Sequence, residues 1–162
     1  MYYKLFGLLI ILILFISGGK EYKQSESLSL VVIHSLDPLS WAIIKASAET
    51  NVPINLLHGI IEWECGNDLS TKVKNKNGTI DLGPGLNSRW IREYQWRFNN
   101  DKSFDPHSLE SVTIVARILA NNYKVFHDWD LTLTSFRWGV SGTIRHGIDY
   151  YYVTNVRSLG NN

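Results

Sequence analysis

The sequence has very little cysteine, since Cys65 is the single cysteine among 162 residues. One thiol cannot form a disulfide within the chain, so disulfides cannot stabilise this fold. Stability must come from a hydrophobic core, and a single domain of this length is large enough to build one. The sequence supplies Cys65 with no base or other feature that would lower its pKa. We therefore expect a small buried thiol rather than a nucleophile.

The chain also lacks a strong charge of either sign. Its 16 Lys and Arg and 15 Asp and Glu leave a net charge of +1, which gives no electrostatic reason to expect nucleic acid as a partner. At 44% hydrophobic and 19% charged residues, the composition is too apolar for a disordered chain. Metal ligands are scattered: His58 and Glu62 are four residues apart but form no HExxH pattern. We therefore expect no metal site and no cofactor.

An apolar run begins the chain but is short for a membrane-spanning helix. Lys4 precedes the apolar residues 5–16, and the small residues Ser17-Gly18-Gly19 follow them. This order is typical of a secretory signal, and a spanning helix needs about 20 apolar residues. We interpret residues 1–19 as a signal peptide or an uncleaved membrane anchor and residues 20–37 as a tether. The protein is then exported to the periplasm or cell envelope, and it contacts the inner membrane only if this segment is retained.

Most of the remaining chain has helical spacing. We expect helices over residues 38–50, 54–64, 88–99, 105–126, 131–138 and 150–158, with a loop at 140–147. The polar stretch 69–81 contains the turn pair Asn77-Gly78, which predicts a small hairpin or loop lobe. The fold class is therefore mostly α, with a single helical domain over residues 38–160 and one small β or loop lobe.

One carboxylate lies on the apolar side of a predicted helix. The apolar arc consists of Leu56, Leu57, Ile60, Ile61 and Glu64. Glu62 points roughly the opposite way. Burial disfavours the charged form of a carboxyl group and raises its pKa, and a carboxylic acid that stays protonated near neutral pH can act as a general acid on sugars. The alternative is a Glu at the rim whose carboxylate reaches water past the helix end.

Several short motifs follow one another from residue 52 to residue 156. They are Val52-Pro53, Leu56-Leu57, Ile60-Ile61, Glu64-Cys65-Gly66, Asn77-Gly78-x-x-Asp81-x-Gly83, Asn87-Ser88, Asp105-Pro106, residues 133–139 and Tyr152-Val153-x-x-Val156. In this order they resemble the soluble lytic transglycosylase domain family of the lysozyme-like superfamily. The resemblance implies an α+β lysozyme-like fold. It also implies peptidoglycan glycan strands as the partner, with further partners conceivable in a cell-envelope assembly.

The resemblance also implies a chemistry. In that family a single Glu cleaves the β-1,4 bond between N-acetylmuramic acid and N-acetylglucosamine and leaves a 1,6-anhydro sugar, and Glu64 matches that residue. A hydrolytic muramidase is an alternative that would use Asp81 as a second carboxylate, although Asp81 is also a typical turn residue beside Asn77-Gly78. A non-catalytic relative that binds glycan or scaffolds an assembly is another.

Four further residues match positions that line the sugar groove in the family or lie beside its acid. Asn87 could bond an acetamido group or simply precede a helix cap, and Phe136, where the family has Tyr, could line the groove or the core. Arg137, where the family has Asn, could contact a lactyl or peptide carboxylate or be a solvated surface residue. Tyr152 could orient Glu64 through its hydroxyl or pack in the core.

Overall fold

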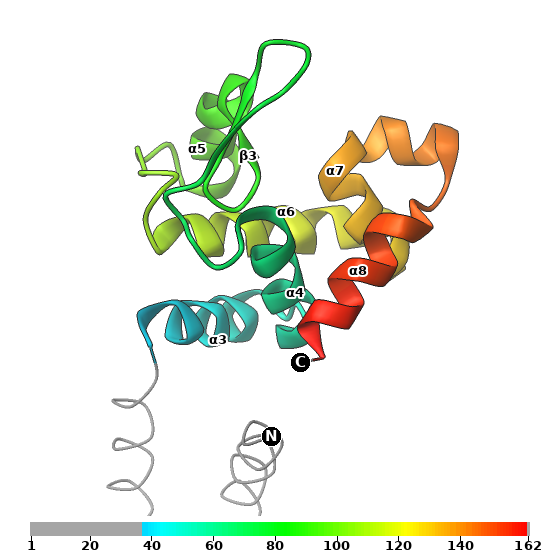
Figure 1. Cartoon of the computed structure of the whole chain (residues 1–162), viewed down its shortest axis with the longest axis horizontal. Coiled ribbons are helices and arrows are strands. Elements are labelled where there is room, and N and C mark those ends of the chain that lie inside the picture. Colours follow the sequence, from blue (N-terminus) through cyan, green and yellow to red (C-terminus); the bar gives the residue numbers. More distant parts are fainter. Residues whose placement is uncertain (1–36, 162) are drawn as a thin grey trace, which may run out of the picture. The chain divides into compact units, whose positions relative to one another are not determined.

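The structure is a computed structural model that describes residues 37–161 (Figure 1). The predicted signal or anchor segment and all of the predicted tether except Asp37 lie outside the described residues. Pro38–Asn161 forms one compact unit. Its helices are α3 Pro38–Thr50, α4 Ile54–Cys65, α5 Ile91–Phe98, α6 Glu110–Phe126, α7 Trp129–His146 and α8 Tyr150–Gly160, with a short 3-10 helix, η1, at Ser88–Trp90. Its strands are β1 Lys72–Lys74, β2 Ile80–Leu82 and β3 Leu86–Asn87.

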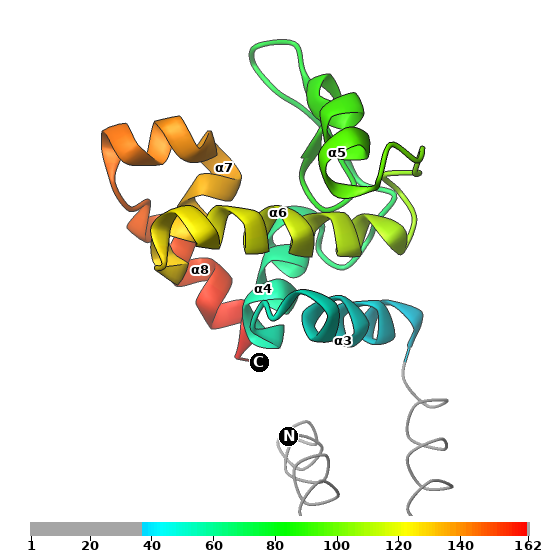
Figure 2. The same cartoon turned by 180° about the vertical axis from the view of Figure 1, so that it is seen from behind.

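The domain is mostly helical, as the sequence predicts. Figures 1 and 2 show α6 crossing its middle, with α3 and α4 on one side and the strands and α5 on the other. Among the described residues, no helix is long and apolar enough to cross a membrane.

The core is built around α4. Leu57, Ile60 and Ile61 are completely buried, which confirms the apolar arc predicted for this helix. Val112 and Leu119 of α6 are also completely buried. Because burying one such side chain contributes about 1.5–3 kcal/mol, these contacts hold α4 firmly in the centre of the domain.

Helices α4 and α8 pack backbone against backbone. A Cβ atom on Gly59 would clash with the carbonyl oxygen of Val156, and one on Gly160 would clash with that of Asn55. Since a glycine has no Cβ, the two helices approach more closely than side chains would allow. This approach sets the end of α4 beside the beginning of α8.

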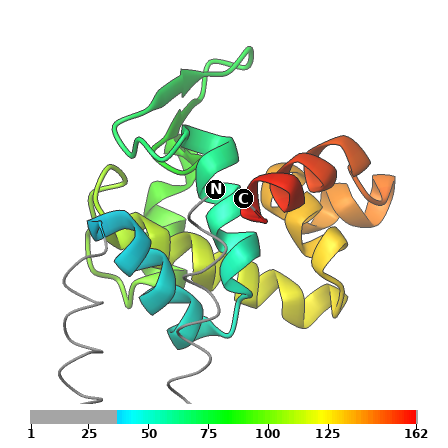
Figure 3. The same cartoon turned by 60° about the horizontal axis from the view of Figure 1, so that its bottom comes forward.

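The lobe at residues 69–87 is a small antiparallel sheet in the order β1-β2-β3. Val73 pairs with Asp81, and Asp81 pairs in turn with Asn87. Gly78 has a φ of 81° in the connection between β1 and β2, so the predicted hairpin turn is confirmed. Figure 3 shows the strands and this turn projecting from the helices.

The beginnings of α5 and α6 differ from the sequence prediction. The side chain of Asn87, rather than that of Ser88, accepts the capping hydrogen bond from the backbone N–H of Arg89, and it caps η1 ahead of α5. Helix α6 begins at Glu110 rather than at Asp105. The carboxylate of Asp105 instead accepts the backbone N–H of His107 in a turn, as Asp commonly does before Pro.

The predicted loop at 140–147 is wrong. Gly139 does interrupt the helix, with a φ of 71° and a ψ of 163°, but helical geometry resumes and lasts to His146. Thr143 is buried, and its hydroxyl donates to the carbonyl oxygen of Gly139. Because Thr143 is buried, packing holds the segment after the break in place, where a glycine stop alone would predict a loop.

Candidate active site

Glu64 lies in the last turn of α4. Gly66 ends the helix in the left-handed conformation, with a φ of 59° and its N–H donated to the carbonyl of Glu62, which is a common way for a helix to end. The side chain of Glu64 is half-buried. Because the helix stops directly after it, the carboxyl group reaches past the core into an open cleft.

The cleft has a volume of about 800 Å³, a usual size for a ligand site. Its lining comes from the β lobe, α5, α6 and α7 as well as Glu64, and it includes Asp81, Gly85, Asn87, Trp90, Tyr94, Asn121, Asn122, Ser135, Phe136, Arg137 and Trp138. Asn87, Phe136 and Arg137, which the resemblance selects from distant parts of the sequence, therefore share one cleft with Glu64. Phe136 also packs against the core, so its side chain lies between the cleft and the core.

Tyr152 lies beneath Glu64 and is completely buried. Its hydroxyl donates a hydrogen bond of 2.7 Å to Oε1 of Glu64. Burial raises the pKa of Tyr152 well above its ordinary value, and the neighbouring Glu64 carboxylate raises it further. The phenol thus stays protonated and keeps donating, so Tyr152 both packs in the core and orients the carboxyl group.

The pKa of Glu64 is raised above its ordinary value, chiefly because burial removes water from the carboxylate. The hydrogen bond from Tyr152 opposes this, as does the positive charge of Arg137, whereas the negative charge of Asp81 raises the pKa further. The direction is the one expected for a Glu on an apolar helix face. Glu64 is therefore an acid that holds its proton to a higher pH than an exposed Glu.

Gly85 covers the other side of the Glu64 carboxyl group. A Cβ atom at Gly85 would lie 2.9 Å from Oε2 of Glu64, and the residue has a φ of 83°. Only glycine fits such a position without strain. The connection between β2 and β3 therefore lies close against one carboxylate oxygen, while Tyr152 donates a hydrogen bond to the other.

Asp81 and Asn87 form a pair on the wall of the β lobe. Nδ2 of Asn87 donates to Oδ1 of Asp81 at 2.8 Å and to Oγ1 of Thr79 at 3.0 Å. Asp81 belongs to strand β2, so its interpretation as a turn residue is wrong. Asn87 thus forms hydrogen bonds within the β lobe and caps η1, and it also lines the cleft.

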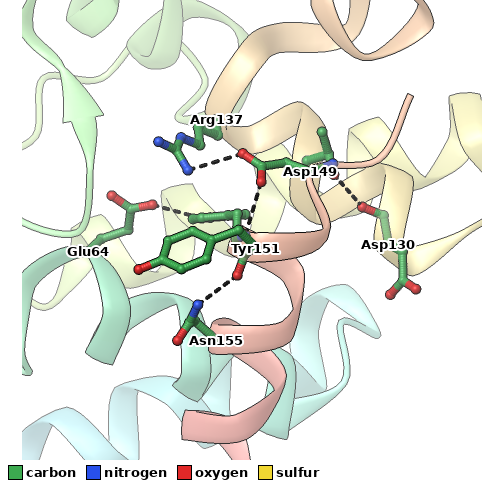
Figure 4. Close-up of polar contacts among 8 residues, drawn as sticks. Glu64, Asp130, Arg137, Asp149, Tyr151 and Asn155 are labelled. Carbon is green, nitrogen blue, oxygen red and sulfur yellow. Dashed lines mark hydrogen bonds and ion pairs between the residues drawn. The ribbon is translucent and has the colours of Figure 1, made fainter. Parts of the chain in front are cut away.

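Arg137 is held by an ion pair although its side chain is 46% exposed. Its Nη1 donates to Oδ2 of Asp149 at 3.1 Å, and its guanidinium lies 5.5 Å from the centre of the Tyr152 ring, within cation–π range. Figure 4 shows this ion pair, with the Arg137 guanidinium and the Glu64 carboxyl group on the same side of α8. Arg137 is therefore exposed to solvent, as its interpretation as a surface residue expects, and it also lines the cleft.

Sequence reasoning missed Asp149 and most of the aromatic lining. Asp149 caps α8 by accepting the backbone N–H of Tyr152, and an Asp directly before a helix is a recognisable capping signal. Trp90, which is 53% exposed, also lines the cleft. Burial raises the pKa of Tyr94 to about 12, so this lining residue remains a neutral phenol.

The remaining reactive side chains lie outside this arrangement. Cys65 is buried and donates its S–H to the carbonyl of Ile61, and burial raises its pKa to about 11. His58 and Glu62 are 3.9 Å apart, and both are partly exposed. Across residues 37–161, no three His, Cys, Asp or Glu side chains cluster in a way that could hold a metal ion.

A comparison of the chain with protein-family models finds no match, and neither curated proteins nor solved structures give a significant one. The evidence for function is therefore the order of motifs in the chain and the geometry around Glu64.

Proposed function

We propose that this protein is an exported peptidoglycan lytic transglycosylase with a lysozyme-like domain, in which Glu64 is the general acid and base. One observation carries the proposal: the half-buried carboxyl group of Glu64 opens into a cleft of about 800 Å³ while a buried Tyr152 hydroxyl holds it at 2.7 Å. The order of motifs around these residues supports it.

In the first step, protonated Glu64 donates its proton to the oxygen that bridges the two sugars. The bond from C1 of the muramic residue to that oxygen breaks, and N-acetylglucosamine leaves with a free hydroxyl. The burial that raises the pKa of Glu64 favours this step, because the acid must still carry a proton near neutral pH.

In the second step, the Glu64 carboxylate accepts the proton of the muramic C6 hydroxyl as that oxygen attacks C1. The product is a 1,6-anhydro sugar, no water is consumed, and Glu64 is protonated again. The hydroxyl of Tyr152 and the charge of Arg137 stabilise the carboxylate between the two steps. One carboxyl group therefore suffices, whereas most glycosidases use two.

Hydrolysis is the second candidate, and Asp81 is the observation that favours it. Its carboxylate lines the same cleft and raises the pKa of Glu64 by its charge. In a muramidase, Asp81 would act on a water molecule or on the sugar itself while Glu64 supplied the proton. The hydrogen bond from Asn87 would hold Asp81 in the orientation required.

The test is the release of soluble fragments from insoluble peptidoglycan by the full chain. Glu64→Gln keeps an acceptor for Tyr152 but cannot donate an acidic proton, so the rate should fall by at least about 10²–10⁴-fold. Glu62→Gln is a matched control two residues away on a more exposed face, and it should retain the rate. A Glu64→Gln variant that keeps its activity, or a native chain that binds peptidoglycan without releasing fragments, would contradict the proposal.

A further inference from the structure

We propose that Arg137 determines substrate specificity by binding a carboxylate carried by the muramic acid residue whose glycosidic bond Glu64 cleaves. This inference rests on the proposed function, because it takes a peptidoglycan strand as the occupant of the cleft. It adds the chemical class of the substituent that the cleft selects.

The guanidinium is positioned in advance for such a contact. Asp149 is only 13% exposed, and its backbone N–H donates to the buried Thr134 hydroxyl while its Oδ1 caps α8. In the described part of the chain, Asp149 engages Nη1 of Arg137, and other N–H groups of the guanidinium remain to donate. A donor group that is already ordered loses less entropy when a ligand binds.

Arg137 also lies beside Glu64, within reach of a substituent of the reacting sugar. Tyr152 contacts Glu64 through its hydroxyl and Arg137 through its ring, which makes the two charged groups neighbours. In the proposed reaction, Glu64 protonates the oxygen bonded to C1 of muramic acid. The C3 lactyl group of that same sugar carries a carboxyl group. The lactyl group is two ring carbons from C1, so a guanidinium beside the acid is within its reach.

The charges of the cleft make this contact selective. Its lining includes Glu64, Asp81 and Glu93 as acids and Arg97 and Arg137 as bases. Arg97 is bound to Glu93 at 2.7 Å, at the α5 wall. A substrate carboxylate near Glu64 would be repelled by the neighbouring acids unless Arg137 compensated for it. An amide at the same place gains much less from a guanidinium than a carboxylate does.

The carboxylate has two sources in peptidoglycan. A glycan strand without peptides carries a free lactyl carboxylate, whereas in a strand with peptide stems the lactyl group is an amide and the carboxylates belong to the stem. The experiment separates the two with three ligands: strands without stems, the same strands with each lactyl group converted to its methylamide, and strands with intact stems.

Binding is measured by calorimetry with the full chain carrying Glu64→Gln, which should not cleave the ligand. Either the strands without stems or the strands with intact stems should bind about tenfold to a hundredfold more tightly than the methylamide strands. The strand type that binds more tightly shows whether Arg137 binds the lactyl carboxylate or a stem carboxylate. Adding Arg137→Gln should abolish this preference. Arg137→Lys keeps the charge without the planar fork and should retain part of it.

Arg145→Gln is the matched control, because it removes an exposed arginine of the same helix that does not line the cleft, and it should leave the preference intact. Equal binding of the three ligands, no binding of any, or a preference that survives Arg137→Gln in a chain with native circular dichroism would overturn the proposal. Cleavage by the chain with native Glu64 is measured separately. Cleavage without a carboxylate preference refutes only the role of Arg137, and a preference without cleavage refutes only the enzymatic proposal.

Discussion

Gly85 and Glu64 are separated by 21 positions in the sequence, yet a methyl group on Gly85 would lie 2.9 Å from Oε2 of the Glu64 carboxyl group. The connection between β2 and β3 thus touches the proposed acid directly. Tyr152 donates a hydrogen bond to the other oxygen, so the carboxyl group lies between a strand connection and a helix.

This contact predicts the effect of Gly85→Ala. The new Cβ would push the carboxyl group of Glu64 from its position, and the activity on peptidoglycan should fall about tenfold to a hundredfold, since small misplacements of a catalytic group are costly. Strain at the positive φ should also lower the free energy of unfolding by about 1–2 kcal/mol. Fragment release and urea denaturation measure the two effects.

Gly78→Ala is the control for that variant. Gly78 has a φ of 81°, close to the 83° of Gly85, but a Cβ there would meet no atom within 4 Å. It should lose comparable stability and retain activity. If both variants lost activity equally, backbone strain rather than contact with Glu64 would be the cause.

Tyr152→Phe should change the pH dependence of activity. The hydroxyl of Tyr152 lowers the pKa of Glu64 by stabilising the carboxylate, so removing it raises that pKa further. Glu64 then stays protonated to a higher pH, and the alkaline limb of the pH–rate profile should move upward. An alkaline limb that stayed in place or moved down would show that Tyr152 does not act through the protonation of Glu64.

The same variant should also be less stable, by about 1.5–3 kcal/mol, in alkaline solution where Glu64 is ionised, because a hydrogen bond to a charged group is lost. Glu64 has a higher pKa in the folded chain than in the unfolded chain. Its contribution to stability is therefore fully present below the unfolded pKa and is lost as the pH rises through the folded pKa. The stability difference between Tyr152→Phe and the native chain should accordingly shrink in acid, where the carboxyl group is neutral in both.

Gly59→Ala tests the close approach of α4 and α8. Helix propensity alone would make Ala more stable than Gly by about 1 kcal/mol. The clash with the Val156 carbonyl should instead destabilise the domain by about 1–3 kcal/mol or more, and activity should fall because Glu64 and Tyr152 move apart. A gain of stability in urea denaturation would refute this account of the helix packing.

Cys65 should be chemically inert. With its pKa raised to about 11, the thiol carries at least about a hundredfold less thiolate at pH 8 than an ordinary cysteine with a pKa of about 8.5. Iodoacetamide should modify the folded chain correspondingly slowly and the urea-unfolded chain at the usual rate. Cys65→Ser should retain activity, and rapid labelling of the folded chain or loss of activity on this substitution would argue against a purely structural thiol.

Much of the helical framework follows from local sequence. The burial of Leu57, Ile60 and Ile61 could be predicted because apolar residues at helical spacing have one way to leave water. Gly66 and the Asn77-Gly78 turn could be predicted because few residues adopt positive φ readily. These signals lie within a few positions of the structure that they specify.

The parts that the sequence did not reveal depend on distant or competing contacts. The helix after Gly139 packs Thr143 into the interior of the domain, and a helix-stop rule cannot anticipate this burial. The ion pair between Arg137 and Asp149 joins two ends of a folded-back segment, and the closeness of Gly85 to Glu64 requires the β lobe to be placed on α4. Such contacts are consequences of packing rather than of local spacing.

The most direct test of the proposal is the mass of the sugar end that the full chain releases from purified peptidoglycan. A lytic transglycosylase with Glu64 as its acid and base must yield 1,6-anhydro-muramic ends, lighter than reducing ends by one water molecule, and Glu64→Gln must yield none. Reducing ends would contradict the single-residue mechanism and assign the second carboxylate role to Asp81. The absence of both products from the native chain would contradict the enzymatic proposal itself.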